Sequence, residues 1–120
     1  PNTRATAIFK NNLGETYTFI GYPEMARVCF EDAIKLYGLN FKYYQNLAEC
    51  YKTLGVTNSK MRELSSSKSP YDKIMLGLLQ IQAGQTRKGV ITLDDFCTQE
   101  PDLIITPAIR QYLKEATAKL

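Results

Sequence analysis

The feature that most constrains the fold is a pattern of leucine, tyrosine and glycine that returns at a nearly fixed spacing. The recurrence at 34 residues links three pairs of positions: Leu13 and Leu47, Tyr17 and Tyr51, and Gly21 and Gly55. A shorter recurrence of 29 residues links two further pairs: Leu47 and Leu76, and Gly55 and Gly84. Periods of about 20 to 50 residues indicate tandem supersecondary units. Such units must stack, because a single one cannot bury its apolar face.

The first unit, about residues 7–40, carries the fullest version of the pattern. It has a Leu-Gly pair, an aromatic residue three positions later, a turn glycine and a small-large-small series: Leu13, Gly14, Tyr17, Gly21, Ala26, Phe30 and Ala33. The other units cover about 41–69 and 70–103. This spacing resembles the tetratricopeptide repeat (TPR) family. The resemblance implies an all-α, right-handed superhelix of about three helical hairpins, with a capping helix at 106–119.

Helix signals agree with this division. The expected helices are about 3–20, 23–37, 41–54, 58–66, 70–83, 86–99 and 106–119. The glycines at 21, 55 and 84 are expected to end first helices. Ser69 before Pro70 and Thr106 before Pro107 are predicted N-caps. Ala26 and Gly77 are predicted to lie at close contacts between helices.

Two segments leave alternatives open. Residues 57–69 have no strong apolar period, and a shortened helix is favoured over an interdomain linker. The helix at 70–83 is apolar on almost every side, which is typical of a helix buried all round. Either the capping helix or a partner is expected to cover its inner face.

Composition argues against catalysis and against metal binding. The 120 residues fit one domain, residues 1–120. The chain has no histidine, the commonest general base and a common zinc ligand, and no CxxC pair. Glycines are isolated, so no phosphate-binding loop is predicted. We therefore expect a non-enzymatic protein without a cofactor.

Charge and cysteine content bear on partners and location. The net charge is +3 with the signs mixed along the chain, which does not favour nucleic-acid binding. No apolar run is long enough to span a membrane or to form a signal peptide. The three cysteines are odd in number and widely spaced, so a reducing cytoplasmic or nuclear compartment is expected. The first residue is not Met, which suggests a fragment or a processed chain.

The resemblance implies that first helices line a groove for a protein or peptide. The positions carried over by register are Asn12, Glu15, Lys42, Asn46, Glu49, Met75, Leu78 and Ile81. One subclass of the family grips the C-terminal carboxylate of heat-shock chaperones with Lys, Asn and Arg. The corresponding positions here are Asn11, Glu15, Asn46, Tyr71 and Met75. Only one of the five matches, so that activity is not expected, because a carboxylate needs cationic donors.

A looser resemblance involves residues 41–54 and 73–85 and the shortened middle unit. These features are similar to the N-terminal domain of the family of subunit 7 of the anaphase-promoting complex. That resemblance implies a self-associating scaffold in a cell-cycle ubiquitin ligase, and we predict a homodimer that involves Met75 and Leu78. Alternatives are a regulatory or targeting TPR domain of a larger protein and a bacterial TPR-type chaperone.

Overall fold

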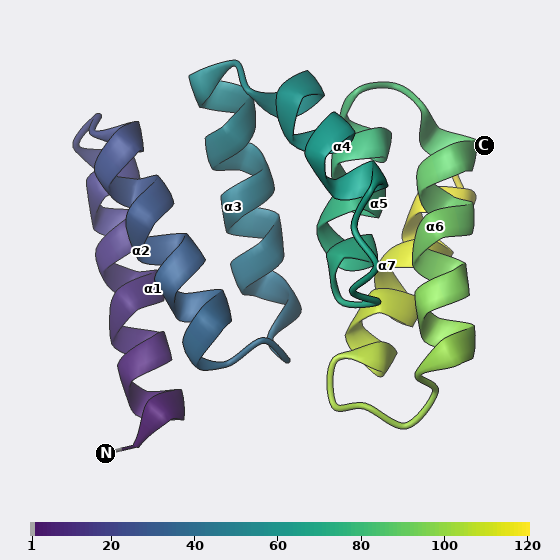
Figure 1. The fold of residues 1–120 in the computed structure, drawn as a ribbon, viewed down its shortest axis with the longest axis horizontal. Coiled ribbons are helices and arrows are strands. Elements are labelled where there is room, and N and C mark those ends of the chain that lie inside the picture. Colours follow the sequence, from purple (N-terminus) through teal and green to yellow (C-terminus); the bar gives the residue numbers. More distant parts are fainter. Residues whose placement is uncertain (1) are drawn as a thin grey trace. The chain divides into compact units, whose positions relative to one another are not determined.

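The structure is a computed structural model that describes residues 2–120, and within them it contains seven α-helices and no strand (Figure 1). The helices are α1 (Thr3–Phe19), α2 (Pro23–Leu36), α3 (Phe41–Leu54), α4 (Thr57–Ser65), α5 (Asp72–Gln82), α6 (Thr86–Gln99) and α7 (Thr106–Thr117). The all-α prediction is confirmed, and each predicted helix is found within two residues of its expected ends. Residues 57–65 are helical, which confirms the shortened helix.

The chain divides into two compact units, with the boundary after Val56. Unit 1 contains α1 to α3, and unit 2, which begins at Thr57, contains α4 to α7. The division falls inside the predicted second repeat, because α3 and α4 belong to different units. A single domain over residues 1–120 stays a prediction.

Unit 1 is held together by small residues on the facing sides of its helices. Gly14 of α1 lies against the ring of Phe30 of α2 so closely that an added Cβ would be 2.6 Å from Phe30 Cε1. Ala7 and Ala33 are fully buried and belong to one cluster with Tyr43 of α3. The small-large-small pattern in the sequence therefore sets how closely α1 and α2 approach.

Unit 2 repeats this arrangement with a second close approach. A Cβ added at Gly77 of α5 would lie 2.5 Å from Leu93 Cγ of α6, and Leu93 is fully buried. This confirms the predicted close contact at Gly77. Arg110 of α7 forms an ion pair with Asp94 of α6, so α7 packs on the last hairpin.

The three turn glycines have the backbone conformation that the sequence predicts. The φ angles of Gly21, Gly55 and Gly84 are 88°, 73° and 90°. Residues with a Cβ adopt this left-handed region at a cost, so glycine is favoured directly after a helix. These positions fix where the first helix of each repeat ends.

Both predicted N-caps are wrong. Helix α5 begins at Asp72, because Pro70 and Tyr71 form a turn in which the Asp72 amide donates to the Ser69 carbonyl at 3.2 Å. Thr106 is the first residue of α7 and does not cap it. Its hydroxyl donates instead to the carbonyl of Glu100 at 2.6 Å, which ties the start of α7 to the end of α6.

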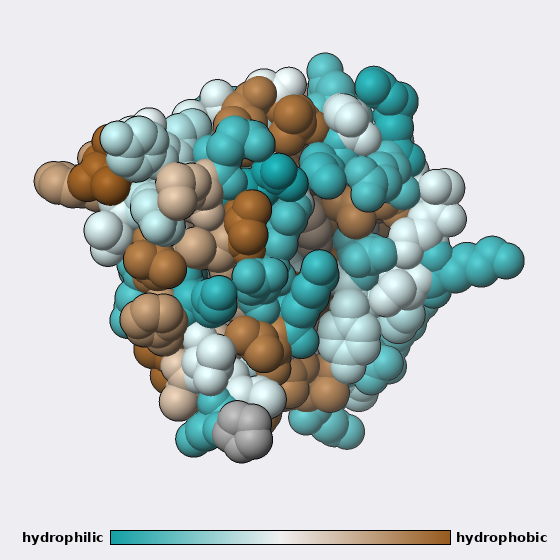
Figure 2. Space-filling view, turned by 60° about the vertical axis from the view of Figure 1, so that its left-hand side comes forward, coloured by the Kyte–Doolittle hydropathy of each residue, from teal (hydrophilic) through white to brown (hydrophobic). Residues whose placement is uncertain are grey.

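The exposed apolar residues are unevenly distributed. Several lie on α1, α2 and the turn between them, including Phe9, Phe19 and Ile20, each at least half exposed. On the face that Figure 2 shows, brown apolar side chains reach the surface among teal hydrophilic ones. Among the described residues, no helix combines the length and the apolar character needed to cross a membrane.

Candidate protein-binding groove

In unit 1, the candidate groove is the surface between one face of α1 and one face of α3. On α1, Ile8, Asn12, Glu15 and Phe19 follow spacings of four, three and four residues, which place them along one side of the helix. All four are exposed. The groove therefore has apolar ends and a polar centre on the α1 side.

A shared polar contact sets the distance between α1 and α3. The side-chain amide of Asn46 donates to Asn11 Oδ1 at 2.9 Å and to Glu15 Oε2 at 3.3 Å. Asn11 is 6% exposed, so the stronger of these bonds is largely shielded from water. Asn46 thus joins the two groove walls and holds the Glu15 carboxylate at the groove surface.

A depression of about 280 Å³ opens between the two walls. It is lined by Glu15, Thr18, Gly21, Pro23, Phe30, Asn46, Glu49, Cys50 and Thr53. The buried ring of Phe30 contributes an apolar surface, while Glu15 and Glu49 are exposed. Two lining residues carry negative charge, and none of the described lining residues is Lys or Arg. The depression therefore favours a positively charged group over a carboxylate.

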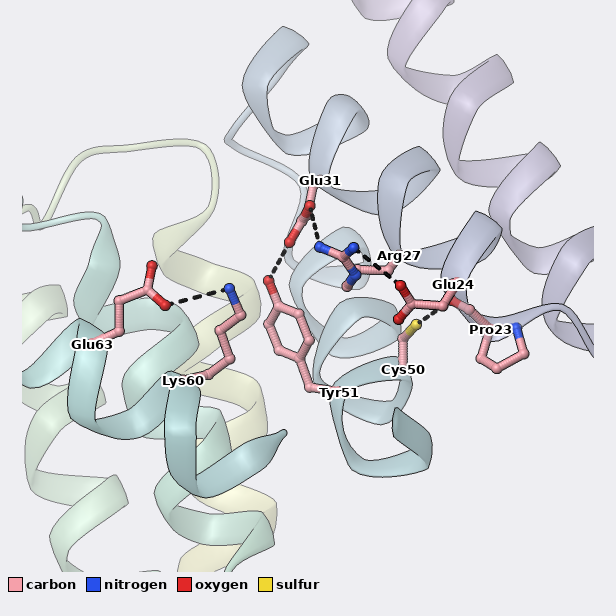
Figure 3. Close-up of polar contacts among 8 residues, drawn as sticks. All are labelled: Pro23, Glu24, Arg27, Glu31, Cys50, Tyr51, Lys60 and Glu63. Atoms are coloured by element: carbon pink, nitrogen blue, oxygen red, sulfur yellow. Dashed lines mark hydrogen bonds and ion pairs between the residues drawn. The ribbon is translucent and has the colours of Figure 1, made fainter. Parts of the chain in front are cut away.

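Cys50 lines this depression as a buried thiol. Its thiol donates to the Pro23 carbonyl at 3.2 Å (Figure 3). Burial, partly opposed by the charge of Arg27, raises the pKa of the Cys50 thiol to about 11. Since only a thiolate attacks or binds a metal ion well, the thiol is inert near neutral pH. Within the described residues, no group of three or more potential metal ligands lies together.

The α3 wall is fixed to α2 by a network that sequence reasoning did not identify (Figure 3). Tyr51 Oη donates to Glu31 at 2.7 Å, and Arg27 contacts Glu31 at 3.4 Å and Glu24 at 3.2 Å. The hydrogen bond to Glu24 and the nearby Glu31 carboxylate raise the pKa of Arg27 above its ordinary value. The ion pairs of this network could have been predicted from the charge spacing in the sequence of α2, because Arg27 lies three residues from Glu24 and four residues from Glu31.

The remaining predicted groove residues differ in how accessible they are. Lys42 is exposed on α3, whereas Met75 and Leu78 of α5 are only 6% and 5% exposed. Ile81 is partly buried and lines a second depression in unit 2 together with Tyr112 of α7. Met75 and Leu78 are thus core residues and not part of an open surface. Their helix, α5, packs mainly against α6 and α4, and not against the capping helix α7 as the sequence suggested.

The structure also bears on the carboxylate clamp. Asn11 and Asn46 are hydrogen-bonded to each other, and Glu15 stands where a cationic or amide donor would be needed. Met75 is buried. The absence of the clamp stays a prediction.

Comparisons with known proteins address the fold. Residues 8–38 match the sequence profile of the tetratricopeptide repeat. The structure is similar to that of the Arabidopsis OM64 TPR domain, with a TM-score of 0.51 and 15% sequence identity over 94% of this chain and 98% of that domain. No curated protein sequence matches the chain significantly. The chain therefore has a TPR-like all-helical fold, and the repeat at residues 8–38 is recognisable from sequence.

Proposed function

We propose that this chain is a non-enzymatic protein-interaction module that binds a peptide segment of a partner in the groove between α1 and α3. TPR repeats in general mediate protein–protein interactions. The observation that carries the proposal is the depression between the two walls, which has the buried Phe30 ring at its base and two exposed residues, Glu15 and Glu49, beside it. Peptide sites commonly combine an apolar surface with a few polar groups that fix orientation.

The residues around the depression indicate the chemistry of the peptide. A lysine or arginine side chain of the partner would lie between Glu15 and Glu49, where a charge-assisted hydrogen bond can form. An apolar residue of the partner would cover Phe19, which is 90% exposed beside Thr18 at the same end of α1. The preferred segment therefore contains a basic residue next to a large apolar residue.

A peptide titration tests this proposal. Fluorescently labelled peptides that carry Arg flanked by Leu or Phe should bind the chain, and matched peptides with Glu in place of Arg should bind at least about tenfold more weakly. Glu15→Lys should abolish the preference for Arg. Asp102→Lys is the matched control, because it makes the same charge change at an exposed position in unit 2 and should leave the binding unchanged.

Two outcomes would contradict the proposal. One is equal binding of the Arg and Glu peptides by the unmodified chain. The other is an equal loss of affinity in Glu15→Lys and Asp102→Lys, which would indicate a general charge effect without a defined site.

Several predictions from the sequence go beyond peptide binding. A homodimer that uses Met75 and Leu78 is not proposed, because both side chains are buried. A role in the anaphase-promoting complex rests on the sequence resemblance alone and stays a prediction, as do the targeting-domain and bacterial-chaperone alternatives. Affinity capture with this chain tests the first of these directly: recovery of several subunits of that complex would support it.

A further inference from the structure

We propose that Ser69 is a phosphorylation site for a protein kinase that recognises serine or threonine followed by proline. Ser69 precedes Pro70 in residues 66–71, which connect α4 and α5 (Figure 1). This connection belongs to unit 2 and lies outside the groove between α1 and α3. The proposal therefore does not depend on the proposed function.

The sequence contains two such dipeptides, and the structure makes only one of them accessible. The other is Thr106 followed by Pro107. Thr106 is 4% exposed and is the first residue of α7, and its hydroxyl donates to the Glu100 carbonyl at 2.6 Å. Ser69 is exposed and lies outside any helix. Because a kinase must surround the acceptor hydroxyl and the residues beside it, the folded chain offers Ser69 and withholds Thr106.

The Ser69 hydroxyl also differs from those of the three serines at positions 65 to 67. The latter hydroxyls donate within the same segment: Ser65 to the Met61 carbonyl at 2.6 Å, Ser66 to the Glu63 carbonyl at 3.1 Å, and Ser67 to the Asp72 carboxylate. Within residues 2–120, no hydrogen bond of the Ser69 hydroxyl is found, and only its backbone amide is bonded in this cluster, to Ser67 Oγ. Ser69 Oγ is therefore available as a phosphoryl acceptor.

The backbone around Ser69 can become extended, as a kinase substrate must, at little cost. Proline at the next position disfavours a helical backbone at Ser69. The Ser69 amide donates to Ser67 Oγ at 3.1 Å, and its carbonyl accepts from the Asp72 amide at 3.2 Å. Residues 65–69 are all exposed. Opening these local bonds therefore uncovers no buried side chain of that segment, which is typical of regions that open easily.

The reaction transfers the γ-phosphoryl group of ATP to Ser69. The bond between the γ-phosphorus and the bridging oxygen of the departing ADP breaks, a bond between Ser69 Oγ and phosphorus forms, and the hydroxyl proton passes to the catalytic base of the kinase. Phosphoserine adds a charge of about −1.5 to −2 near pH 7. The net charge of the chain is +3, so the modification removes half or more of it. Because the new charge lies at an exposed position, we expect it to act on contacts with other molecules and not on the core of unit 2.

Phosphorylation of the folded 120-residue chain by a purified proline-directed kinase of the cyclin-dependent class, with Mg²⁺ and ATP, tests this inference. We expect one phosphoryl group per chain, located at Ser69 by fragmentation mass spectrometry. Ser69→Ala should abolish the incorporation, and Pro70→Ala should lower the initial rate at least about tenfold. Ser66→Ala is the matched control, because it makes the same change at an exposed serine of the same connection and should leave the rate unchanged.

Several results would overturn the proposal. One is a folded chain that gains no phosphate; if a synthetic peptide of residues 64–75 is phosphorylated by the same kinase, the fold conceals Ser69. Phosphate on Thr106 or on another serine, with Ser69 unmodified, would place the site elsewhere. Equal rates for Pro70→Ala and the unmodified chain would mean that the proline is not recognised. Circular dichroism confirms folding of each variant, and Ser69→Thr, which keeps a hydroxyl before the proline, should still be phosphorylated.

Discussion

Replacing Gly77 with alanine tests whether the close approach of α5 and α6 limits the stability of unit 2. The new Cβ would lie 2.5 Å from Leu93 Cγ and 2.8 Å from Leu93 Cδ2, and 3.1 Å from the Gly89 carbonyl oxygen. Leu93 is fully buried, so it cannot move aside without disturbing its neighbours. Overpacking of this kind costs about 1–3 kcal/mol. Because alanine is favoured over glycine within a helix by about 1 kcal/mol, we expect a net loss of up to about 2 kcal/mol.

A double-mutant cycle isolates the contact with Leu93. Leu93→Ala alone should lower the free energy of unfolding by about 2–5 kcal/mol, because it leaves a cavity. In that background, Gly77→Ala no longer meets the leucine side chain and should be neutral or stabilising by up to about 1 kcal/mol. The coupling free energy between the two sites should therefore be about 2 kcal/mol, measured by urea unfolding and circular dichroism. Additive effects of the two substitutions, with no coupling free energy between Gly77 and Leu93, would refute the close approach.

The remaining predictions concern polar contacts. Tyr51→Phe should lower the free energy of unfolding by about 1 kcal/mol, because it removes the hydrogen bond to Glu31 without changing shape; an unchanged urea midpoint would mean that the bond adds nothing. Thr106→Val should cost about 1 kcal/mol by removing the donor to the Glu100 carbonyl, whereas Thr106→Ser should retain most of the stability; equal urea midpoints for the two variants would contradict this. The pKa of Cys50 is raised to about 11 from an ordinary value of 9.0. The contribution of the buried, protonated Cys50 thiol to the free energy of unfolding should be complete below pH 9 and lost as the pH rises towards 11, because the thiol releases its proton at lower pH in the unfolded chain. The unmodified chain should therefore lose stability relative to Cys50→Ala between these pH values, and a constant difference in urea midpoint would argue against a buried thiol.

The first repeat and the helix ends were predictable because local chemistry decides them. Gly21, Gly55 and Gly84 end first helices through a backbone conformation that glycine adopts at little cost. Pro23 begins α2, a position where its missing amide hydrogen is not needed. The start of α5 was misplaced because the same rule suggested Pro70. Pro70 and Tyr71 instead form a turn, and α5 begins after it at Asp72. At this turn the Tyr71 ring packs on the Phe96 ring, with centroids 5.8 Å apart.

The groove could be predicted only in outline. Glu15, Asn46 and Glu49, which repeat register assigned to one groove, line the same depression, because residues at equivalent positions of successive first helices face the same side. It could not show that Asn46 bonds to Asn11, since that contact joins residues 35 positions apart and depends on the separation of α1 and α3. Register also could not distinguish an open position from a buried one. Met75 and Leu78 were therefore assigned to the groove although the chain covers them.

Sequence alone determined the helical repeat, the turns between helices and the lack of histidine-based chemistry, because each depends on residue type and spacing along the chain. Tertiary structure decided which apolar residues remain exposed and where compact units begin and end. Two apolar residues, one from each unit, illustrate the reason. Phe9 and Leu78 are both apolar residues in amphipathic or apolar helices, yet one is 62% exposed and the other is 5% exposed. Burial depends on which helices pack against each side, and that is a property of contacts between segments distant in sequence.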